Sequence, residues 1–249
     1  MQFQPFDRLP ILEWAAWWDQ TIDRWHREGL PAHLSDQCDI GRHFGLDIHR
    51  QDWFGARSAE CPQPASYGAG IIASEEDYDR IRPCLYPSNS VDHDKWQRWA
   101  DEQRRGDVVL WFTLEGFFWY PRTLLGIERD FYAYYDQPDL MHRMNTDLTQ
   151  WLLLVIDEVC SICTPDFMTF AEDMSYNHGP MLSKDLFDEF MKPYYLAVVP
   201  KLNEHNVISM IDSDGDVSVP MNVVYNHHFE APDEPYANPS LTRTQTFSV

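Results

Sequence analysis

Short apolar segments alternate with longer helical patterns along this chain, and this alternation limits the fold more than any other feature. The clearest segment is Asp107–Thr113 (DVVLWFT), whose β-branched and aromatic residues are typical of a strand buried on both faces. Strands that alternate with helices favour an α/β fold with a parallel sheet and crossover helices. The predicted strands lie at 9–14, 69–73, 107–113, 166–173 and 207–212.

The ends of the predicted helices carry recognisable signals. Pro138 opens a long helix over 138–163, and Ser183 is the predicted N-cap of a second helix over 183–204. Ser74 precedes three acidic residues, which the dipole of a helix favours in its first turn. Shorter helices are predicted over 18–28 and 91–105.

The alternating pattern stops near residue 217. Residues 218–249 are rich in Pro and Asn and contain no predicted strand, so we expect an irregular tail after a barrel-like domain over 1–217. His227 and His228 fall in this tail, and no role is predicted for them.

Composition excludes several classes of partner. A formal net charge of -21 repels nucleic acid and anionic membrane surfaces. The five cysteines are odd in number and irregularly spaced, so no disulfide framework is predicted, and Cys160 and Cys163 are interpreted as buried helix cysteines. The chain shows neither a signal peptide nor a membrane-spanning run, so we expect a cytoplasmic protein.

Acidic residues follow three of the predicted strands, where functional groups of α/β barrels gather. They are Glu115, Glu172, Asp173, Asp212 and Asp214. Crowded carboxylates shift the pKa values of one another, which suits acid–base chemistry. Glu172 and Asp173, with the nearby Tyr176 and His178, are therefore the predicted catalytic residues.

The same residues also have structural interpretations. Glu115 can simply cap the helix that follows its strand, and the Asp212–Asp216 motif can be a turn without chemistry. Alternating aspartates can also ligate a hard divalent cation, which makes Asp212 and Asp214 candidate metal ligands. A tryptophan cluster after the first predicted strand suits either core packing or a pocket wall. It consists of Trp14, Trp17 and Trp18.

Several motifs together resemble the uroporphyrinogen decarboxylase superfamily, over residues 5–217. They are Phe117–Gly126 (FFWYPRTLLG), Tyr135–Met144 (YDQPDLMHRM), Phe170–Ser183 (FAEDMSYNHGPMLS) and Phe187–Tyr194 (FDEFMKPY). The resemblance implies a TIM-type (β/α)₈ barrel, of which about five or six βα units are present. It also implies an enzyme that binds its small-molecule substrate near Trp14, Trp17, Trp18, Glu115 and Arg122.

The chain departs from the two best-known active sites of this superfamily. Decarboxylases of porphyrin biosynthesis carry paired arginines after the first strand, but the equivalent stretch here, Glu13–Asp19, has no arginine to bind a polycarboxylate. Methyltransferases carry a His-x-Cys zinc pair where this chain has Asp212 and Asp214. The second site therefore lacks the soft thiolate ligand of zinc–thiol chemistry.

Three functional hypotheses follow from the resemblance. The first is a decarboxylase-like lyase that acts on a tetrapyrrole or similar compound without a cofactor. The second is a methyltransferase-like enzyme that acts on a methylated compound, with a divalent metal such as zinc and a corrinoid protein as partner. The third is an inactive, truncated barrel, whose unpaired strand edges would favour a homodimer.

Overall fold

The structure is a computed structural model that describes residues 8–215 and the strand at 245–247. The chain divides into two compact units. The first unit comprises Met1–Gln51 with Arg98–Leu110, and the second comprises Asp52–Gln97 with Trp111–Val249. The predicted site residues belong to the second unit, except for the three tryptophans.

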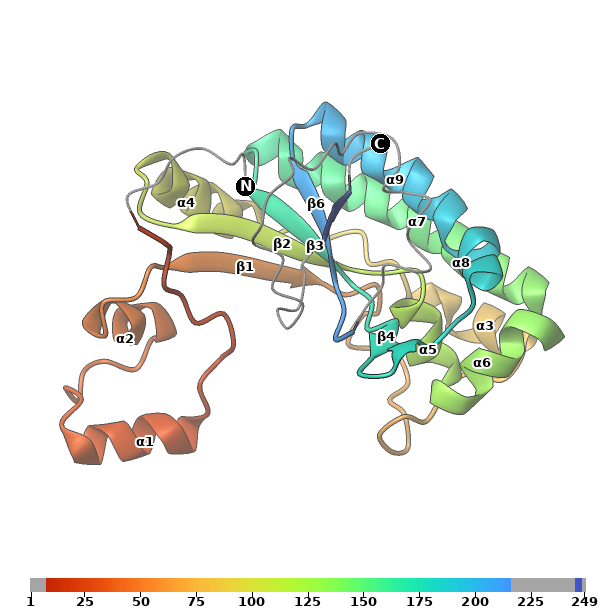
Figure 1. The fold of residues 1–249 in the computed structure, drawn as a ribbon, viewed down its shortest axis with the longest axis horizontal. Coiled ribbons are helices and arrows are strands. Elements are labelled where there is room, and N and C mark those ends of the chain that lie inside the picture. Colours follow the sequence, from red (N-terminus) through yellow and green to blue (C-terminus); the bar gives the residue numbers. More distant parts are fainter. Residues whose placement is uncertain (1–7, 216–244, 248–249) are drawn as a thin grey trace. The chain divides into compact units, whose positions relative to one another are not determined.

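The main sheet has the strand order β1-β2-β3-β6-β7 (Figure 1). Its strands are β1 (His49–Phe54), β2 (Val109–Glu115), β3 (Phe167–Ala171), β6 (Ile208–Asp212) and β7 (Gln245–Phe247). The first four strands of this order form a parallel sheet, whereas β7 pairs antiparallel with β6. The described residues therefore form an α/β fold with an open sheet, and the predicted barrel is not closed within them.

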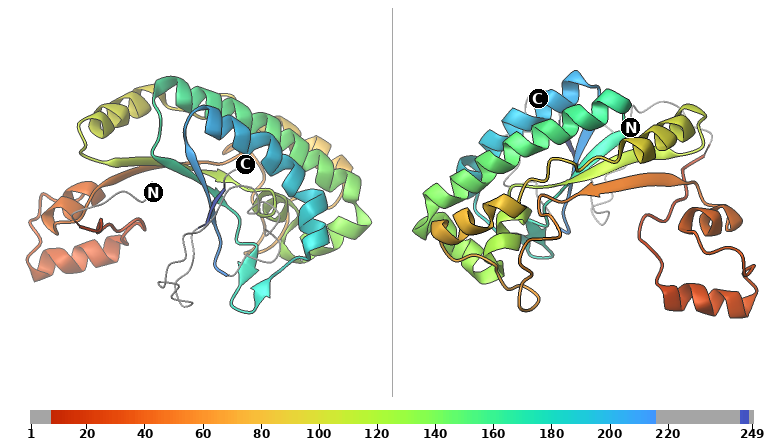
Figure 2. Two further views of the ribbon diagram at one scale, coloured as in Figure 1. Left: turned by 45° about the horizontal axis from the view of Figure 1, so that its top comes forward. Right: turned by 180° about the vertical axis from the view of Figure 1, so that it is seen from behind.

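Helices lie between successive strands of the parallel sheet, as predicted, because a parallel pair of strands needs a long crossover connection. They are α1 (Asp19–Glu28), α2 (Gln37–His43), α3 (Glu75–Ile81), the 3₁₀ turn η1 (Arg82–Cys84), α4 (His93–Arg104), α5 (Trp119–Leu125), α6 (Ile127–Asp136), α7 (Pro138–Ile162), α8 (Lys184–Phe190) and α9 (Lys192–Glu204). A short antiparallel pair, β4 (Ser175–Tyr176) and β5 (Gly179–Pro180), follows β3. Figures 1 and 2 show α7 and α9 side by side, and α9 packs against β6.

The core of the second unit explains why its strands are continuously apolar. Alternate residues of a strand point to opposite faces of the sheet, and residues of both sets are buried here. On one face of the sheet Phe112, Leu114, Met168 and Phe170 are fully buried, and on the other face Thr113 and Thr169 are buried and their hydroxyl groups share a hydrogen bond of 2.8 Å. Fully buried helix residues include Leu148, Leu152, Ile156 and Val198. Water is excluded from both faces, so neither set can be polar without a partner.

Most predicted helix ends are confirmed. The Ser74 side chain accepts a hydrogen bond from the Asp77 amide at the start of α3, and Ser183 accepts one from Leu186 at the start of α8. Pro138 begins α7. The single helix predicted over 183–204 is wrong, because the chain leaves helical geometry at Met191 and Pro193 then opens α9, where its missing N–H costs nothing.

The strand predicted over 9–14 is wrong. This segment lies exposed in the first unit and has no regular secondary structure. Its backbone pairs with Asp47: the Asp47 amide donates to the Ile11 carbonyl oxygen, and the Asp47 carboxylate accepts from the Ile11 amide at 2.8 Å and from the Arg8 guanidinium at 2.7 Å. A charged loop residue thus takes the hydrogen bonds that a neighbouring strand would have made.

The strand predicted over 69–73 is also wrong, because this segment pairs with a helix end. The amides of Ile71 and Ile72 both donate to the Leu124 carbonyl oxygen, and Ala69 forms an isolated bridge with Gly126. The strand that the sequence analysis missed is β1, whose sequence HRQDWF is too polar to suggest a buried strand. Strand β7 lies in the tail for which no strand was predicted, and the other tail residues, including His227 and His228, lie outside the described residues.

The cysteines differ from the sequence prediction. Cys61 and Cys84 form a disulfide across 23 positions of the second unit, although irregular spacing had suggested that no cysteines pair. Sequence spacing carries no information on this pair, because a fold brings distant residues together. Cys160 and Cys163 at the end of α7 do not belong to this disulfide and are only partly buried, which differs from the predicted buried cysteines. In the part of the chain that the structure describes, no helix has the length and apolar character needed to cross a membrane.

Candidate active site

The parallel register brings the acidic residues after three strands to one edge of the sheet. Glu115 at the end of β2 is aligned with Ala171 of β3, which is aligned with Asp212 of β6. The amides of Glu172 and Asp173 both donate to the Asp212 carbonyl oxygen, so the chain after β3 stays against β6. We call this group the carboxylate edge, and its members are Glu115, Glu172, Asp173, Asp212 and Asp214.

Glu172 is fully buried, and its carboxylate is saturated with hydrogen bonds. Its two oxygens accept from the amides of Phe117, Phe118 and Trp119 at 2.7–3.0 Å, and the Tyr195 hydroxyl also donates to Oε1. Burial raises the pKa of Glu172 to about 7, while the three amides act to lower it. These amides lie at the start of α5, so Glu172 supplies the cap that the helix itself lacks.

Gly116 makes room for this arrangement. A Cβ atom at Gly116 would overlap the carboxyl carbon and Oε1 of Glu172. The glycine directly after Glu115 therefore allows the carboxylate from β3 to lie against the backbone that leads into α5.

Asp173 has a different environment. Its backbone has a positive φ of 43°, and 42% of its side chain is exposed. Partial burial and the nearby negative charges of Asp214 and Asp212 raise the pKa of Asp173, whereas Arg122 acts to lower it. Asp173 is thus a partly accessible carboxyl group in a strained backbone conformation, which is a common feature of functional sites.

Arg122 is the cation of this site. Its side chain is only 14% exposed, and its guanidinium carbon lies 5.1 Å from the Phe118 ring centre and 4.6 Å from that of Trp119. Nη1 donates to the Asp173 carbonyl oxygen at 3.4 Å, and Nη2 lies 4.0 Å from the Asp173 carboxylate. The aromatic rings hold a guanidinium that makes only long contacts with Asp173 and so keeps donor capacity for a ligand.

Asp130 on α6 is a buried carboxyl group that the sequence analysis missed. It is fully buried, and neither of its oxygens has a hydrogen-bond partner among the described residues. Burial raises the pKa of Asp130 to about 8; Arg122 opposes this rise and Glu172 adds to it. The signal was the helical spacing of Asp130 with the buried Ala133 and Tyr134, which places all three on one face.

Glu115 is buried, and its Oε2 accepts a hydrogen bond from the Ala56 amide at 2.7 Å. Burial raises the pKa of Glu115, and that amide and Arg57 act against the rise. The segment that follows β1 therefore rests on the end of β2. This contact supports a structural role for Glu115, while its predicted role in substrate binding stays a prediction.

The two predicted metal ligands do not form a metal centre within the described residues. Asp212 and Asp214 are both exposed, and no group of three His, Cys, Asp or Glu side chains in residues 8–215 is arranged to hold a metal ion. Asp216, the last aspartate of the motif, lies outside the described residues. Two exposed carboxylates without a nitrogen or sulfur ligand do not fit a zinc site.

The remaining predicted residues lie on exposed segments. Tyr176 ends β4 and His178 lies in the β4–β5 turn. Their rings stack with centres 5.5 Å apart, and His178 Nδ1 lies 2.7 Å from Asn177 Oδ1. In the first unit, Trp17 packs edge-on against Trp25, while Trp14 and Trp18 are exposed. None of the three tryptophans is buried in a core, and their role in substrate binding stays a prediction.

Comparison with known proteins finds a distant likeness in fold. No family model and no curated protein matches the chain. A solved structure described as a methyltransferase from Methanosarcina mazei is similar in fold, with 14% sequence identity and a TM-score of 0.49 over 88% of this chain and 68% of that chain. A likeness at this level assigns neither family nor activity.

Proposed function

We propose that the carboxylate edge and Arg122 form the active site of an enzyme that acts on a small molecule by carboxylate acid–base chemistry. The observation that carries this proposal is the contact of the partly accessible Asp173 with the largely buried guanidinium of Arg122, beside the hydrogen-bonded carboxylate of Glu172. A cation for binding and a carboxyl group for proton transfer are thereby placed together at the C-terminal edge of a parallel sheet.

The two adjacent carboxyl groups have different roles in this proposal. Three backbone amides at the start of α5 and the Tyr195 hydroxyl of α9 donate to Glu172, so Glu172 is a positioning residue that fixes Trp119 and Arg122. Asp173 is exposed enough to meet a substrate, and partial burial together with the neighbouring aspartates raises its pKa, which favours the protonated form that a general acid needs. Asp173 is therefore the proposed catalytic acid and base.

The reaction class proposed is decarboxylation, as the resemblance to the decarboxylase superfamily implies. Arg122 binds an anionic group of the substrate that is retained in the product. The carbon–carbon bond to a second carboxylate breaks, carbon dioxide leaves, and the electron pair stays on the substrate carbon. Asp173 then donates its proton to that carbon and regains a proton from water, so that one proton is consumed for each carbon dioxide released.

Charge at the site limits the substrate. Asp173, Asp212 and Asp214 provide three carboxylates against the one guanidinium of Arg122. A tetrapyrrole with many carboxylates would meet mainly like charge here. We therefore propose a substrate with two anionic groups, one retained and one lost as carbon dioxide, instead of a porphyrin polycarboxylate.

The same excess of negative charge favours a second candidate, methyl transfer from a small methylated amine. A cationic amine would be attracted by Asp173, Asp212 and Asp214. This reaction requires a methyl acceptor, for which a corrinoid protein is the candidate partner. The described residues contain no group of side chains that is arranged to hold a metal ion, so the structure does not support zinc-dependent methyl transfer.

One pair of assays tests both candidates. Carbon dioxide release is measured with a set of small mono- and dicarboxylic acids, and methyl transfer to a corrinoid protein is measured with methylated amines. We expect carbon dioxide release, with a loss of at least about 100-fold in kcat for Asp173→Asn, the scale of a general acid. Arg122→Gln should mainly raise KM for the anionic substrate.

The matched control is Asp185→Asn, which changes an exposed aspartate in the first turn of α8 and should leave kcat unchanged. Decarboxylase activity that survives Asp173→Asn would overturn the assignment of the catalytic residue. Methyl transfer without carbon dioxide release would replace the first candidate by the second.

A further inference from the structure

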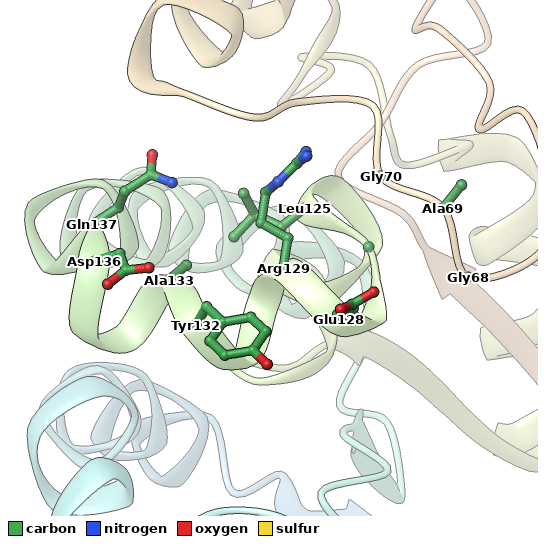
Figure 3. Close-up of a pocket in the computed structure, with 11 residues that line it drawn as sticks. Gly68, Ala69, Gly70, Leu125, Glu128, Arg129, Tyr132, Ala133, Asp136 and Gln137 are labelled. Atoms are coloured by element: carbon green, nitrogen blue, oxygen red, sulfur yellow. The ribbon is translucent and has the colours of Figure 1, made fainter.

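A second site is suggested by a cavity of about 560 Å³ between α6 and the segment 68–70 in the second unit (Figure 3). This volume lies within the range of roughly 300–1,000 Å³ that is typical of small-molecule sites. Figure 3 shows side chains that project from α6, with the backbone of Gly68–Gly70 facing them. The lining side chains used below are Glu128, Arg129, Tyr132, Asp136 and Gln137.

The backbone around this cavity is packed too closely for larger residues. A Cβ atom at Gly70 would overlap the Leu125 carbonyl group, and a Cβ atom at Gly126 would overlap the Gly70 amide. Gly126 also has a positive φ of 84°, and its conformation starts α6 directly after α5 ends. The two glycines therefore fix the segment 68–70 at the position where it forms one wall of the cavity.

Two polar side chains are held in place at the cavity. Arg129 Nη1 donates to the Ile72 carbonyl oxygen at 2.8 Å, and Gln137 Nε2 donates to the Ala73 carbonyl oxygen at 3.2 Å. Each contact uses only part of the hydrogen-bonding capacity of its side chain, since a guanidinium has five N–H donors and an amide also has an acceptor oxygen. Anchored groups with spare capacity bind a ligand at a lower entropic cost than free side chains.

The charges of the lining restrict the ligand. An anion would meet the carboxylates of Glu128 and Asp136, and a cation would meet the guanidinium of Arg129. A neutral hydroxyl group is compatible with both, because it donates to a carboxylate and accepts from a guanidinium. The Tyr132 side chain adds a flat aromatic ring that is 61% exposed. Such a ring can cover the C–H face of a sugar.

We propose that this cavity binds a neutral saccharide, with Tyr132 covering one face of a sugar ring and Arg129, Glu128 and Asp136 binding its hydroxyl groups. The lining residues of the cavity are distinct from the carboxylate edge and Arg122, so this proposal does not depend on the proposed function. It gives the chain a second small-molecule site, formed by the α5–α6 junction.

The test is a titration of the full chain with glucose and with maltotriose, followed by saturation-transfer NMR. We expect saturable transfer from the protein to the sugar C–H protons and tighter binding of maltotriose than of glucose. Tyr132→Ala should weaken binding about three- to tenfold, the scale of a well-placed aromatic contact. Glu128→Gln should weaken it less, because the amide keeps an acceptor oxygen.

The matched control is Tyr135→Ala, which removes another tyrosine of α6 that is 72% exposed and does not line the cavity. This variant should bind both sugars as the wild type does. The proposal fails if neither sugar gives saturable transfer, or if the two tyrosine variants lose binding equally. It also fails if inorganic phosphate or tetramethylammonium binds more tightly than maltotriose, because the lining would then select a charged ligand.

Discussion

Asp130 and Glu172 are both buried carboxyl groups with raised pKa values, yet their hydrogen bonding is opposite. Glu172 accepts from three backbone amides and from Tyr195, whereas neither oxygen of Asp130 has a partner among the described residues. An ionised carboxylate is stabilised by donors and penalised by burial. Replacement of the acid by its amide should therefore raise the free energy of unfolding at Asp130 and lower it at Glu172.

We expect Asp130→Asn to stabilise the protein at high pH. The folded pKa of about 8 lies above the ordinary value of 3.8, so the folded state holds the proton more tightly than the unfolded state does. The contribution of Asp130 to the free energy of unfolding therefore falls as pH rises from about 4 to about 8. The amide cannot ionise, so the variant should exceed the wild type by about 2–4 kcal/mol at pH 9 or so.

The measurement is urea unfolding of both proteins at several pH values between about 4 and 9. At the acidic end, where Asp130 begins to be protonated in the unfolded state as well as in the folded state, the two free energies of unfolding should nearly coincide. Asp136→Asn, at the exposed end of the same helix, serves as the control and should follow the wild type at every pH. Parallel pH profiles for Asp130→Asn and the wild type would contradict the raised pKa of Asp130.

Glu172→Gln should destabilise the protein by about 2–4 kcal/mol at neutral pH, because an amide group replaces an oxygen that accepts hydrogen bonds from the start of α5. Urea unfolding measures this loss, with Glu189→Gln on the exposed side of α8 as the matched control. An unchanged midpoint for Glu172→Gln would show that this carboxylate does not hold α5.

At the scale of elements, α5 depends on a residue from another strand. The helix is only seven residues long and has no side-chain cap from its own segment. Short helices are unstable unless tertiary contacts hold them. Glu172 from the end of β3 provides such a contact, and Gly116 between β2 and α5 leaves the space for it.

We therefore expect Gly116→Ala to lower the free energy of unfolding by about 2 kcal/mol or more, because the methyl group displaces the Glu172 carboxylate. Gly55→Ala is the matched control, since a Cβ atom there meets no atom within 4 Å. Thermal unfolding compares the two variants with the wild type. Equal Tm values for Gly116→Ala and Gly55→Ala would show that α5 does not need this close approach.

At the scale of the whole molecule, the main physical property is a formal net charge of -21. Many of the cations are already paired on the surface, for example Arg143 with Glu75 and Asp79, and Lys201 with Asp157. Such exposed pairs contribute little to stability, whereas the excess negative charge repels itself over longer distances. Screening by salt should therefore stabilise the folded chain.

We expect Tm to rise by a few degrees when sodium chloride is increased from about 20 mM to about 300 mM, because the Debye length falls by several-fold. Differential scanning calorimetry measures this shift, and a neutral solute at equal osmolarity is the control. A fall in Tm over the same range would mean that the surface ion pairs outweigh the repulsion between the acidic residues.

Local signals in the sequence determined several of the strands and helix starts of this protein. Continuous apolar runs predicted β2, β3 and β6, and serine and proline predicted the starts of α3, α7 and α8. These signals act over a short range in the sequence, because the formation of a strand or a helix cap depends mainly on residues that are neighbours in the chain. For the same reason, the polar strand β1 was missed, and the apolar segments at 9–14 and 69–73 were assigned wrongly.

Only the tertiary structure decided which residues meet. The sequence shows that Glu172 and Asp173 are adjacent. It does not show that three backbone amides donate to the Glu172 carboxylate, or that the Arg122 guanidinium faces Asp173. The burial of Asp130 and the pairing of Cys61 with Cys84 also depend on segments that are distant in sequence. Burial and hydrogen bonding set the pKa and role of each acidic residue, and both arise only when these segments pack together.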